Sequence, residues 1–236
     1  MIKYLLNLPS FLIRKFKSKK ISYSLTSIDL LINHVFKNKK KGFFIDVGCN
    51  HPVYNNNSYL LYKKGWRGIN IDLDKKSIEL FNLYRKDDCN INSAISSKPE
   101  ILDLYFYHDK SPINTLNKKS SDYQKVKPKI IKKVNTQTLD TVIINSKLSG
   151  KKFDFLSIDV EGHELNVLKG LNLKKYSPSI IVVEYLDLTI NKLEVCNFNV
   201  QNILNSELYN YMLKNGYNLV NWIHSDLVFA HNKFKI

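Results

Sequence analysis

The chain has 236 residues, of which 44% are hydrophobic, and this length and composition fit one globular domain with a substantial core. Its formal net charge is +15, but lysine supplies nearly all of the positive charge, because arginine occurs only at Arg14, Arg67 and Arg85. The composition therefore lacks the clustered arginine forks that grip phosphate, and we expect no nucleic-acid partner.

The three cysteines are widely spaced and indicate a reducing compartment. Cys49, Cys89 and Cys196 form no C-x-x-C pair, which argues against both a disulfide framework and a thiolate zinc site. We therefore expect a cytoplasmic protein.

Residues 1–25 are predicted to be a leader that precedes a single domain at residues 26–236. Within residues 1–20 an apolar stripe is followed by several lysines, a pattern typical of a helix that lies on an anionic membrane surface. A leader helix packed on the domain, or a poorly ordered extension, explains the same residues. The basic cluster follows the apolar part, unlike in a secretory signal, and no segment approaches the ~20 apolar residues of a membrane-spanning helix.

Helices and strands alternate through the first half of the domain. A helix is expected over residues 26–42, with Thr26 or Ser27 as its N-cap and Gly42 as its stop. A buried strand at 42–48, a short helix at 58–65 and a second buried strand at 68–72 then form a βαβ crossover. A helix at 75–86 precedes strands at 89–96 and 101–108, which a short turn is expected to join as an antiparallel pair. Residues 109–134 are predicted to be a lid or an insertion.

The second half continues the alternation. Strands are expected at 153–159 and 179–185, helices at 163–171 and 206–216, and a terminal hairpin at 217–232 that turns near Ser225 and Asp226. The whole pattern predicts an α/β fold: a Rossmann-like, doubly wound, mostly parallel seven-stranded sheet with helices on both faces and an antiparallel C-terminal hairpin.

Acidic residues end four of the predicted strands, namely Asp46, Asp72, Asp159 and Glu184. Ligands of doubly wound sheets bind at these ends, and Asp72 is suited to accept hydrogen bonds from the ribose diol of either a dinucleotide or S-adenosylmethionine. A pyrophosphate requires a G-x-G-x-x-G cradle, whereas no glycine follows Gly48 until Gly65. The residues therefore favour S-adenosylmethionine.

The cofactor's parts can be assigned to separate residues. Asp46 is expected near the cationic methionine end, and Asn50, Asn57 and Ser58 are candidate donors to its carboxylate, although Asn57 or Ser58 could instead cap the following helix. Ser93 and Ala94 are expected beside the adenine, or they form an ordinary strand end. The predicted cofactor-binding residues are Asp46, Gly48, Cys49, Asn50, Asn57, Ser58, Asp72, Leu73, Ser93, Ala94 and Asp159.

An ordered series of blocks resembles the FkbM-type methyltransferases. The blocks are FIDVGCNHPVYNNNSYLLYKKGWRGINID, INSAIS, VNTQTLD, FDFLSIDVEGHELNVLKGL and IIVVEY, which together cover residues 43–185. The resemblance implies a class I methyltransferase fold and transfer of a methyl group from S-adenosylmethionine to hydroxyl oxygens of sugars and polyketide-like natural products. A carbohydrate or glycan is accordingly the expected acceptor.

Methyl transfer to a hydroxyl needs in-line positioning and a group that accepts the proton. The motif DVEGHE places Asp159, Glu161 and His163 just past a strand end, and Glu184 ends the next strand, so these four are the predicted catalytic residues. Glu161 and His163 are the candidate bases, or they cap the following helix, whereas Glu164 is expected to be a solvated helix residue. The four catalytic candidates could also hold Mg²⁺, but spacing alone does not show that they converge, and we predict no metal site.

Two other functions remain open from the sequence. The high net charge leaves RNA as an alternative acceptor, in which case binding would weaken steeply with salt. The domain could also be a cofactor-binding module without activity, although the complete DVEGHE motif favours an enzyme.

Overall fold

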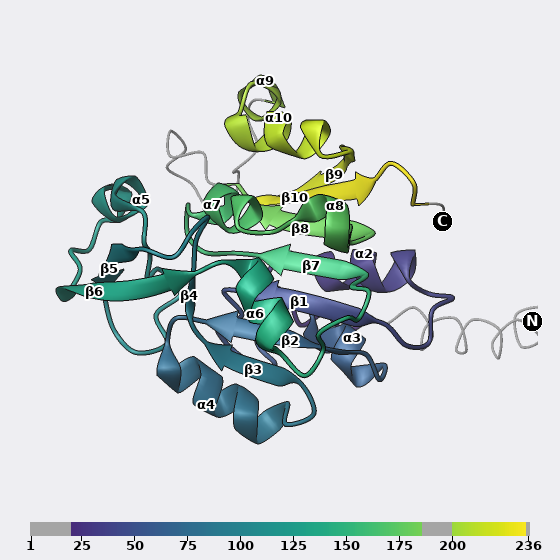
Figure 1. Cartoon of the computed structure of the whole chain (residues 1–236), viewed down its shortest axis with the longest axis horizontal. Coiled ribbons are helices and arrows are strands. Elements are labelled where there is room, and N and C mark those ends of the chain that lie inside the picture. The colour runs from purple at the N-terminus through teal and green to yellow at the C-terminus, as the bar shows by residue number, and fades with distance from the viewer. Residues whose placement is uncertain (1–19, 186–199, 235–236) are drawn as a thin grey trace, which may run out of the picture.

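The computed structural model describes residues 20–185 and 200–234 (Figure 1). The predicted apolar stripe of the leader falls within residues 1–19 and lies outside the described residues. None of the helices in the described ranges combines the length and the apolar character that a membrane crossing requires.

The predicted elements occur in the predicted order, but some of the observed elements were not predicted. The first half contains α2 (Ile28–Val35), β1 (Phe43–Val47), α3 (Tyr59–Lys63), β2 (Arg67–Asp72), α4 (Lys75–Tyr84), β3 (Cys89–Asn92), β4 (Ala94–Ile95) and β5 (Ile101–Phe106). The second half contains α5 (Lys118–Tyr123), β6 (Ile130–Gln137), α6 (Leu139–Asn145), β7 (Phe155–Ile158), α7 (Glu164–Lys169), α8 (Leu173–Tyr176), β8 (Ile180–Glu184), α9 (Val200–Leu204), α10 (Glu207–Lys214), β9 (Tyr217–Ile223) and β10 (Asp226–His231). The strand predicted at 89–96 is divided into β3 and β4, and α5, β6, α6, α8 and α9 are additional.

The main sheet has seven strands in the order β3-β2-β1-β7-β8-β10-β9 (Figure 1). Strands β3, β2, β1, β7 and β8 are parallel, and β10 pairs antiparallel with both β8 and β9. The predicted doubly wound fold with its terminal hairpin is therefore confirmed. Strand order reverses between β1 and β7, and the carboxyl ends on either side of this point are where such sheets bind ligands.

A second, three-stranded sheet corrects the predicted pairing of residues 89–108. Its order is β4-β6-β5, with β4 parallel and β5 antiparallel to β6. Strands β4 and β5 therefore do not form a hairpin, because β6 lies between them. Strand β6 begins inside the predicted lid or insertion and extends beyond it, and its mostly exposed, lysine-rich sequence hides the alternation that usually marks a strand.

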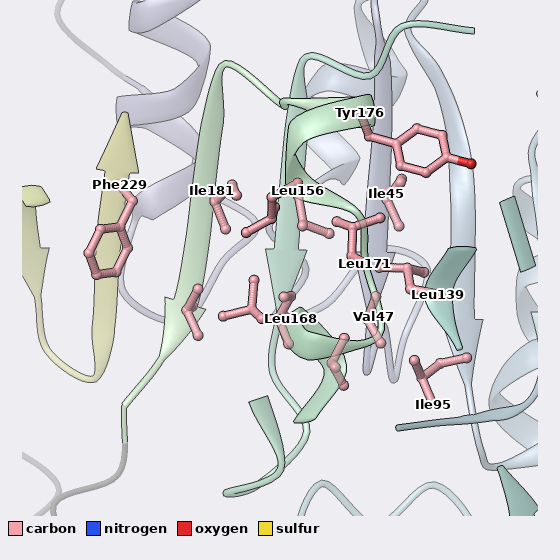
Figure 2. Close-up of a cluster of buried hydrophobic side chains, with 14 of the residues drawn as sticks. Ile45, Val47, Ile95, Leu139, Leu156, Leu168, Leu171, Tyr176, Ile181 and Phe229 are labelled. Atoms are coloured by element: carbon pink, nitrogen blue, oxygen red, sulfur yellow. The ribbon is translucent and has the colours of Figure 1, made fainter. Parts of the chain in front are cut away.

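Side chains of the central strands alternate between two cores on opposite faces of the sheet. Ile45 and Leu156 belong to the larger core, which includes buried residues of α6 and α7 (Figure 2). Phe44 and Phe155 belong to the other, which includes buried residues of α2 and α3. Helices on both faces thus fix β1 and β7 side by side.

Helix α2 ends differently from the prediction. It begins after Ser27, as expected, but Ser27 adopts a left-handed conformation without a side-chain cap. Gly42 does not stop the helix, which already ends at Val35. Gly42 instead lies where a Cβ atom would come within 2.6 Å of the ring of Trp66, so the residue permits close packing at the start of β1.

Candidate active site

A cavity of about 910 Å³ lies beyond the carboxyl ends of β1, β2, β7 and β8. Gly48, Asp72, Asp159 and Glu184 line it, each at or just past the end of one of these strands. Its volume is near the upper end for small-molecule sites, which leaves room for a cofactor and part of an acceptor. The strand order predicted a site at this edge, and the cavity lies there.

The loop after β1 approaches the loop after β7 backbone to backbone. Gly48 has a φ of 80°, and a Cβ atom there would lie 1.6 Å from the carbonyl oxygen of Asp159. Only glycine fits both the conformation and the contact. This approach brings the residues that follow β1 and β7 into one cavity wall.

Asp72, at the end of β2, is held by two backbone amides. Its Oδ2 accepts from the N–H of Asn50 at 2.8 Å, and its Oδ1 accepts from the N–H of Asp74 at 2.7 Å. Burial raises the pKa of Asp72 to about 6, against the lowering effect of these two hydrogen bonds. Each oxygen retains a free acceptor site, so the fixed carboxylate can receive a pair of hydroxyl donors from the cavity.

Asp46 faces away from the cavity, which corrects its predicted role at the methionine end. Its Oδ2 accepts from Ser58 Oγ at 2.6 Å and from Asn56 Nδ2 at 3.1 Å. None of these three side chains lines the cavity. Burial raises the pKa of Asp46, while Ser58 and the nearby Arg85 lower it. Asp46 and Ser58 therefore hold the loop that follows β1 rather than the ligand.

Arg85 completes this buried network and was not anticipated from the sequence. It is fully buried, and its Nε donates to Asp88 Oδ2 at 2.9 Å. Its Nη1 donates to Asn56 Oδ1 at 3.1 Å and to Ser58 Oγ at 3.0 Å. The guanidinium thus links the end of α4 to the loop after β1.

Of the other predicted cofactor-binding residues, all but Cys49 line the cavity. Cys49 is buried and does not line the cavity. The cavity-lining members of the predicted cofactor set are Gly48, Asn50, Asn57, Asp72, Leu73, Ser93, Ala94 and Asp159. Asn57 donates through Nδ2 to Ser157 Oγ at 3.1 Å, so its amide is fixed beside β7.

Three carboxylates converge on the opposite wall of the cavity. Asp159, Glu161 and Glu184, hereafter the acidic trio, each offer an oxygen, and these oxygens lie within 4.8 Å of one another. Asp159 is open to the cavity, but protein atoms crowd its other sides, so desolvation together with nearby carboxylates raises its pKa to about 7. Burial and neighbouring carboxylates also raise the pKa of Glu161 and that of Glu184 well above the usual range.

The turn after β7 positions two members of the acidic trio, Asp159 and Glu161, whereas Glu184 ends β8. Glu161 has a φ of 57°, an unusual conformation for a non-glycine residue. Oε1 of Glu164 accepts from the backbone N–H groups of Val160 at 3.1 Å and Gly162 at 2.9 Å. The prediction that Glu164 is a solvated helix residue is therefore wrong: its side chain is buried and shapes the turn.

His163 does not face the cavity, which corrects its prediction as a base. Its Nε2 lies 3.1 Å from Ser96 Oγ, and its Nδ1 lies 3.2 Å from Asn166 Nδ2. The ring is buried, and burial lowers its pKa. His163 links α7 to the end of β4 and does not line the cavity.

Part of the predicted lid covers the acidic trio. Thr115 Oγ1 donates to the carbonyl oxygen of Glu161 at 2.8 Å, and Asn117 Nδ2 donates to the carbonyl oxygen of Gly162. Residues before and after Thr115 and Asn117 in the segment 110–126, hereafter the covering segment, line the cavity. The segment is thus attached directly to the turn that carries Glu161.

The cavity is also lined by three residues that were not predicted as part of the site: Thr26, Asp226 and Tyr54. Thr26 and Asp226 line the cavity, and Thr26 Oγ1 donates to Asp226 Oδ2 at 2.6 Å, which joins the start of α2 to β10. Tyr54 also lines the cavity, beside His51, whose Nδ1 accepts from the N–H of Tyr54 at 2.9 Å. Nothing local in the sequence distinguishes these residues, because the chain reaches the site from distant elements.

Comparisons with known proteins agree with this geometry. A family model described as a methyltransferase FkbM domain matches residues 46–219, which begin in β1 and end in β9. The match therefore spans most of the main sheet and all three members of the acidic trio. No curated protein and no solved structure matches the chain.

Proposed function

This chain belongs to the FkbM methyltransferase family, and from that premise we propose that it transfers the methyl group of S-adenosylmethionine to a hydroxyl oxygen of a carbohydrate or a related natural product. The observation that carries the proposal is the cavity at the strand-order reversal, with Asp72 on one wall and the acidic trio on another. The first wall suits a ribose diol, and the second suits a cationic methyl donor next to an ionising hydroxyl.

The cofactor would extend from β2 towards β7. Asp72 would accept from the two ribose hydroxyls, and Ser93 and Ala94 would flank the adenine. Asn50 and Asn57 would donate to the methionine carboxylate, and the sulfonium would point towards Asp159. The bulky Asn50-His51-Pro52 sequence after Gly48 leaves no glycine cradle for a pyrophosphate, which supports this cofactor over a dinucleotide.

The chain's side chains would then position the acceptor and take its proton. The acceptor oxygen attacks the methyl carbon from the side opposite the sulfur, so that the C–O bond forms as the C–S bond breaks and its electron pair returns to sulfur. The hydroxyl proton passes to a carboxylate of the acidic trio, and the products are a methyl ether and S-adenosylhomocysteine.

The character of the cavity supports a neutral, hydroxylated acceptor. The acidic trio and Asp226 line the acceptor side, which disfavours a polyanion such as RNA. Tyr54 and Tyr123 supply aromatic rings in the same cavity, and carboxylates beside aromatic rings suit the hydroxyls and the C–H faces of a sugar.

A transfer assay with methyl-labelled S-adenosylmethionine tests the proposal. Free sugars, nucleotide sugars, lipid-linked sugars and RNA are offered as acceptors, and the products are analysed by mass spectrometry after mild alkali, which hydrolyses methyl esters but leaves methyl ethers intact. We expect label in an alkali-stable sugar product and little in Glu161→Gln. Label confined to RNA or to an alkali-labile product would contradict the proposal.

A further inference from the structure

The acidic trio concentrates negative charge without a matching cation among the described residues. None of the ion pairs formed within residues 20–185 and 200–234 involves Asp159, Glu161 or Glu184. The charged groups with the largest raising effect on the pKa of Asp159 are all acidic, namely Asp226, Glu164 and Asp46, whereas a hydrogen bond with Glu184 lowers it. Like charges at such distances are unfavourable unless protons or a cation neutralise them.

Glu184 provides an independent indication of a ligand. Its side chain is held at the end of β8 with only 9% of the residue exposed, and it lines the cavity with Asp159 and Glu161. Its Oε2 atom is buried and has no hydrogen-bond partner among the described residues. A buried carboxylate oxygen without a donor is costly, so its retention here points to a partner that comes from the cavity.

The distances between the oxygens of the acidic trio fit the coordination of a hard cation. Two oxygens bound to one Mg²⁺ at about 2.1 Å lie at most about 4.2 Å apart, and two bound to Ca²⁺ at about 2.4 Å lie at most about 4.8 Å apart. The trio's oxygens lie within 4.8 Å of one another, so small side-chain movements suffice for either ion. An all-carboxylate set selects oxygen-preferring ions over ions that favour nitrogen or sulfur.

We propose that Asp159, Glu161 and Glu184 together bind one divalent, oxygen-preferring cation such as Mg²⁺, Mn²⁺ or Ca²⁺. Three protein ligands leave further coordination positions open towards the cavity. This inference deepens the proposed function and rests on it only for the cation's role, which is to bind the acceptor hydroxyl and favour the loss of its proton. The binding of the cation itself does not depend on that role.

The alternative is that protons alone neutralise the trio. A hydrogen bond between the carboxyls of Glu184 and Asp159 would require one such proton, and the raised pKa of each group is compatible with it. A proton and a cation compete for the same oxygens, so a direct measurement of metal binding separates the two.

Titration of the purified full chain with Mn²⁺, followed by electron paramagnetic resonance of the free ion, tests the inference without any turnover. We expect one Mn²⁺ bound per chain, displaced by Mg²⁺ or Ca²⁺, with at least tenfold weaker binding in the nearly isosteric variants Glu184→Gln and Asp159→Asn. Asp72→Asn is the matched control, because it removes a cavity carboxylate that is neither in the trio nor among the charges that shift its pKa values most, and its Mn²⁺ affinity should stay within about threefold of the wild type.

Absence of Mn²⁺ binding in the wild type, or binding that neither trio variant weakens, would overturn the inference. If Glu184→Gln does not fold, Asp159→Asn decides, because this side chain opens to the cavity and is not needed to fill the core. Calorimetry with S-adenosylhomocysteine on the same preparations separates the two proposals. Binding of S-adenosylhomocysteine without Mn²⁺ binding would reject only the cation, whereas the reverse would reject the methyl-donor site.

Discussion

The Oδ2 atom of Asp72 accepts a hydrogen bond from the backbone N–H of Asn50 at 2.8 Å, across the gap between the ends of β2 and β1. This bond couples the residue that suits a ribose diol to the loop that passes along the cavity. Asn50 has a φ of 47°, so its backbone is turned to make the contact. The Asp72 carboxylate is therefore oriented before any ligand arrives, which would reduce the ordering cost of binding the proposed ribose diol.

The affinity for S-adenosylhomocysteine should fall at acidic pH because of Asp72. Its pKa of about 6 means that the carboxylate is ionised above pH 6 and becomes protonated as the pH falls through 6. Only the ionised form accepts from both ribose hydroxyls, so calorimetry should give a dissociation constant that rises about tenfold from pH 7 to pH 5. Asp72→Asn should bind S-adenosylhomocysteine weakly, with little dependence on pH. If the affinity of the wild type does not change between pH 7 and pH 5, the proposed role of Asp72 is contradicted.

Gly48→Ala should disrupt the site far more than Gly65→Ala. Both glycines have positive φ values, but only the Gly48 Cβ position lies against the backbone of Asp159, whereas that of Gly65 has no atom within 4 Å. Gly65→Ala should cost about 1–2 kcal/mol of unfolding free energy from conformation alone. Gly48→Ala must also separate the two loops and should lower the affinity for S-adenosylhomocysteine at least tenfold. Equal effects of the two variants in urea unfolding and calorimetry would show that the loop contact is unimportant.

Replacement of the buried Arg85 should destabilise the domain. Arg85→Met leaves Asp88 buried without its ion partner and also removes donors to Asn56 and Ser58. A loss of about 3–5 kcal/mol in the free energy of urea unfolding is expected. Arg67→Met is the control, because Arg67 pairs with the exposed Asp87, and its loss should stay below about 1 kcal/mol. Similar losses for both variants would refute the structural role of Arg85.

The covering segment should open more readily when its hydrogen bond from Thr115 to the backbone of Glu161 is removed. Thr115→Val keeps the side-chain shape and deletes the hydrogen bond to the carbonyl oxygen of Glu161, worth about 1 kcal/mol. It also removes the acceptor for the backbone N–H of Asn117, within the same segment. Trypsin should then cleave at Lys118, Lys119 or Lys125 about fivefold faster. Thr141→Val serves as control, because its hydroxyl bonds to that of Thr138, the N-cap of α6, and neither residue lines the cavity. Unchanged cleavage in Thr115→Val would mean that other contacts hold the segment.

The sequence predicts the centre of the main sheet well because β1, β2, β7 and β8 are short, largely apolar runs with an acid at or next to the end of each. Strand β6 escapes detection since its outer residues are exposed lysines and isoleucines without a buried face. Within the predicted lid or insertion at 109–134, residues of the segment 110–126 line the cavity, whereas the end of that section begins strand β6.

Asp72, Asp159 and Glu184, predicted at strand ends, line the cavity, whereas the predictions for Asp46 and His163 failed because they depend on the direction of the side chain. Asp46 follows Ile45 in β1, so it shares a face with Phe44 and points towards Arg85 instead of the cavity. This alternation is visible in the sequence and could have revealed the role of Asp46. The orientation of His163 depends on Ser96, which lies 67 positions away, and no local pattern reveals that contact.

Calorimetric titration with S-adenosylhomocysteine, comparing the wild type with Asp72→Ala and with NAD as a competing ligand, tests the proposed cofactor site most directly. We predict micromolar binding of S-adenosylhomocysteine by the wild type, at least tenfold weaker binding by Asp72→Ala, and no measurable binding of NAD. Preference for NAD, absence of binding, or an affinity that Asp72→Ala leaves unchanged would contradict the assignment of this cavity to a methyl donor.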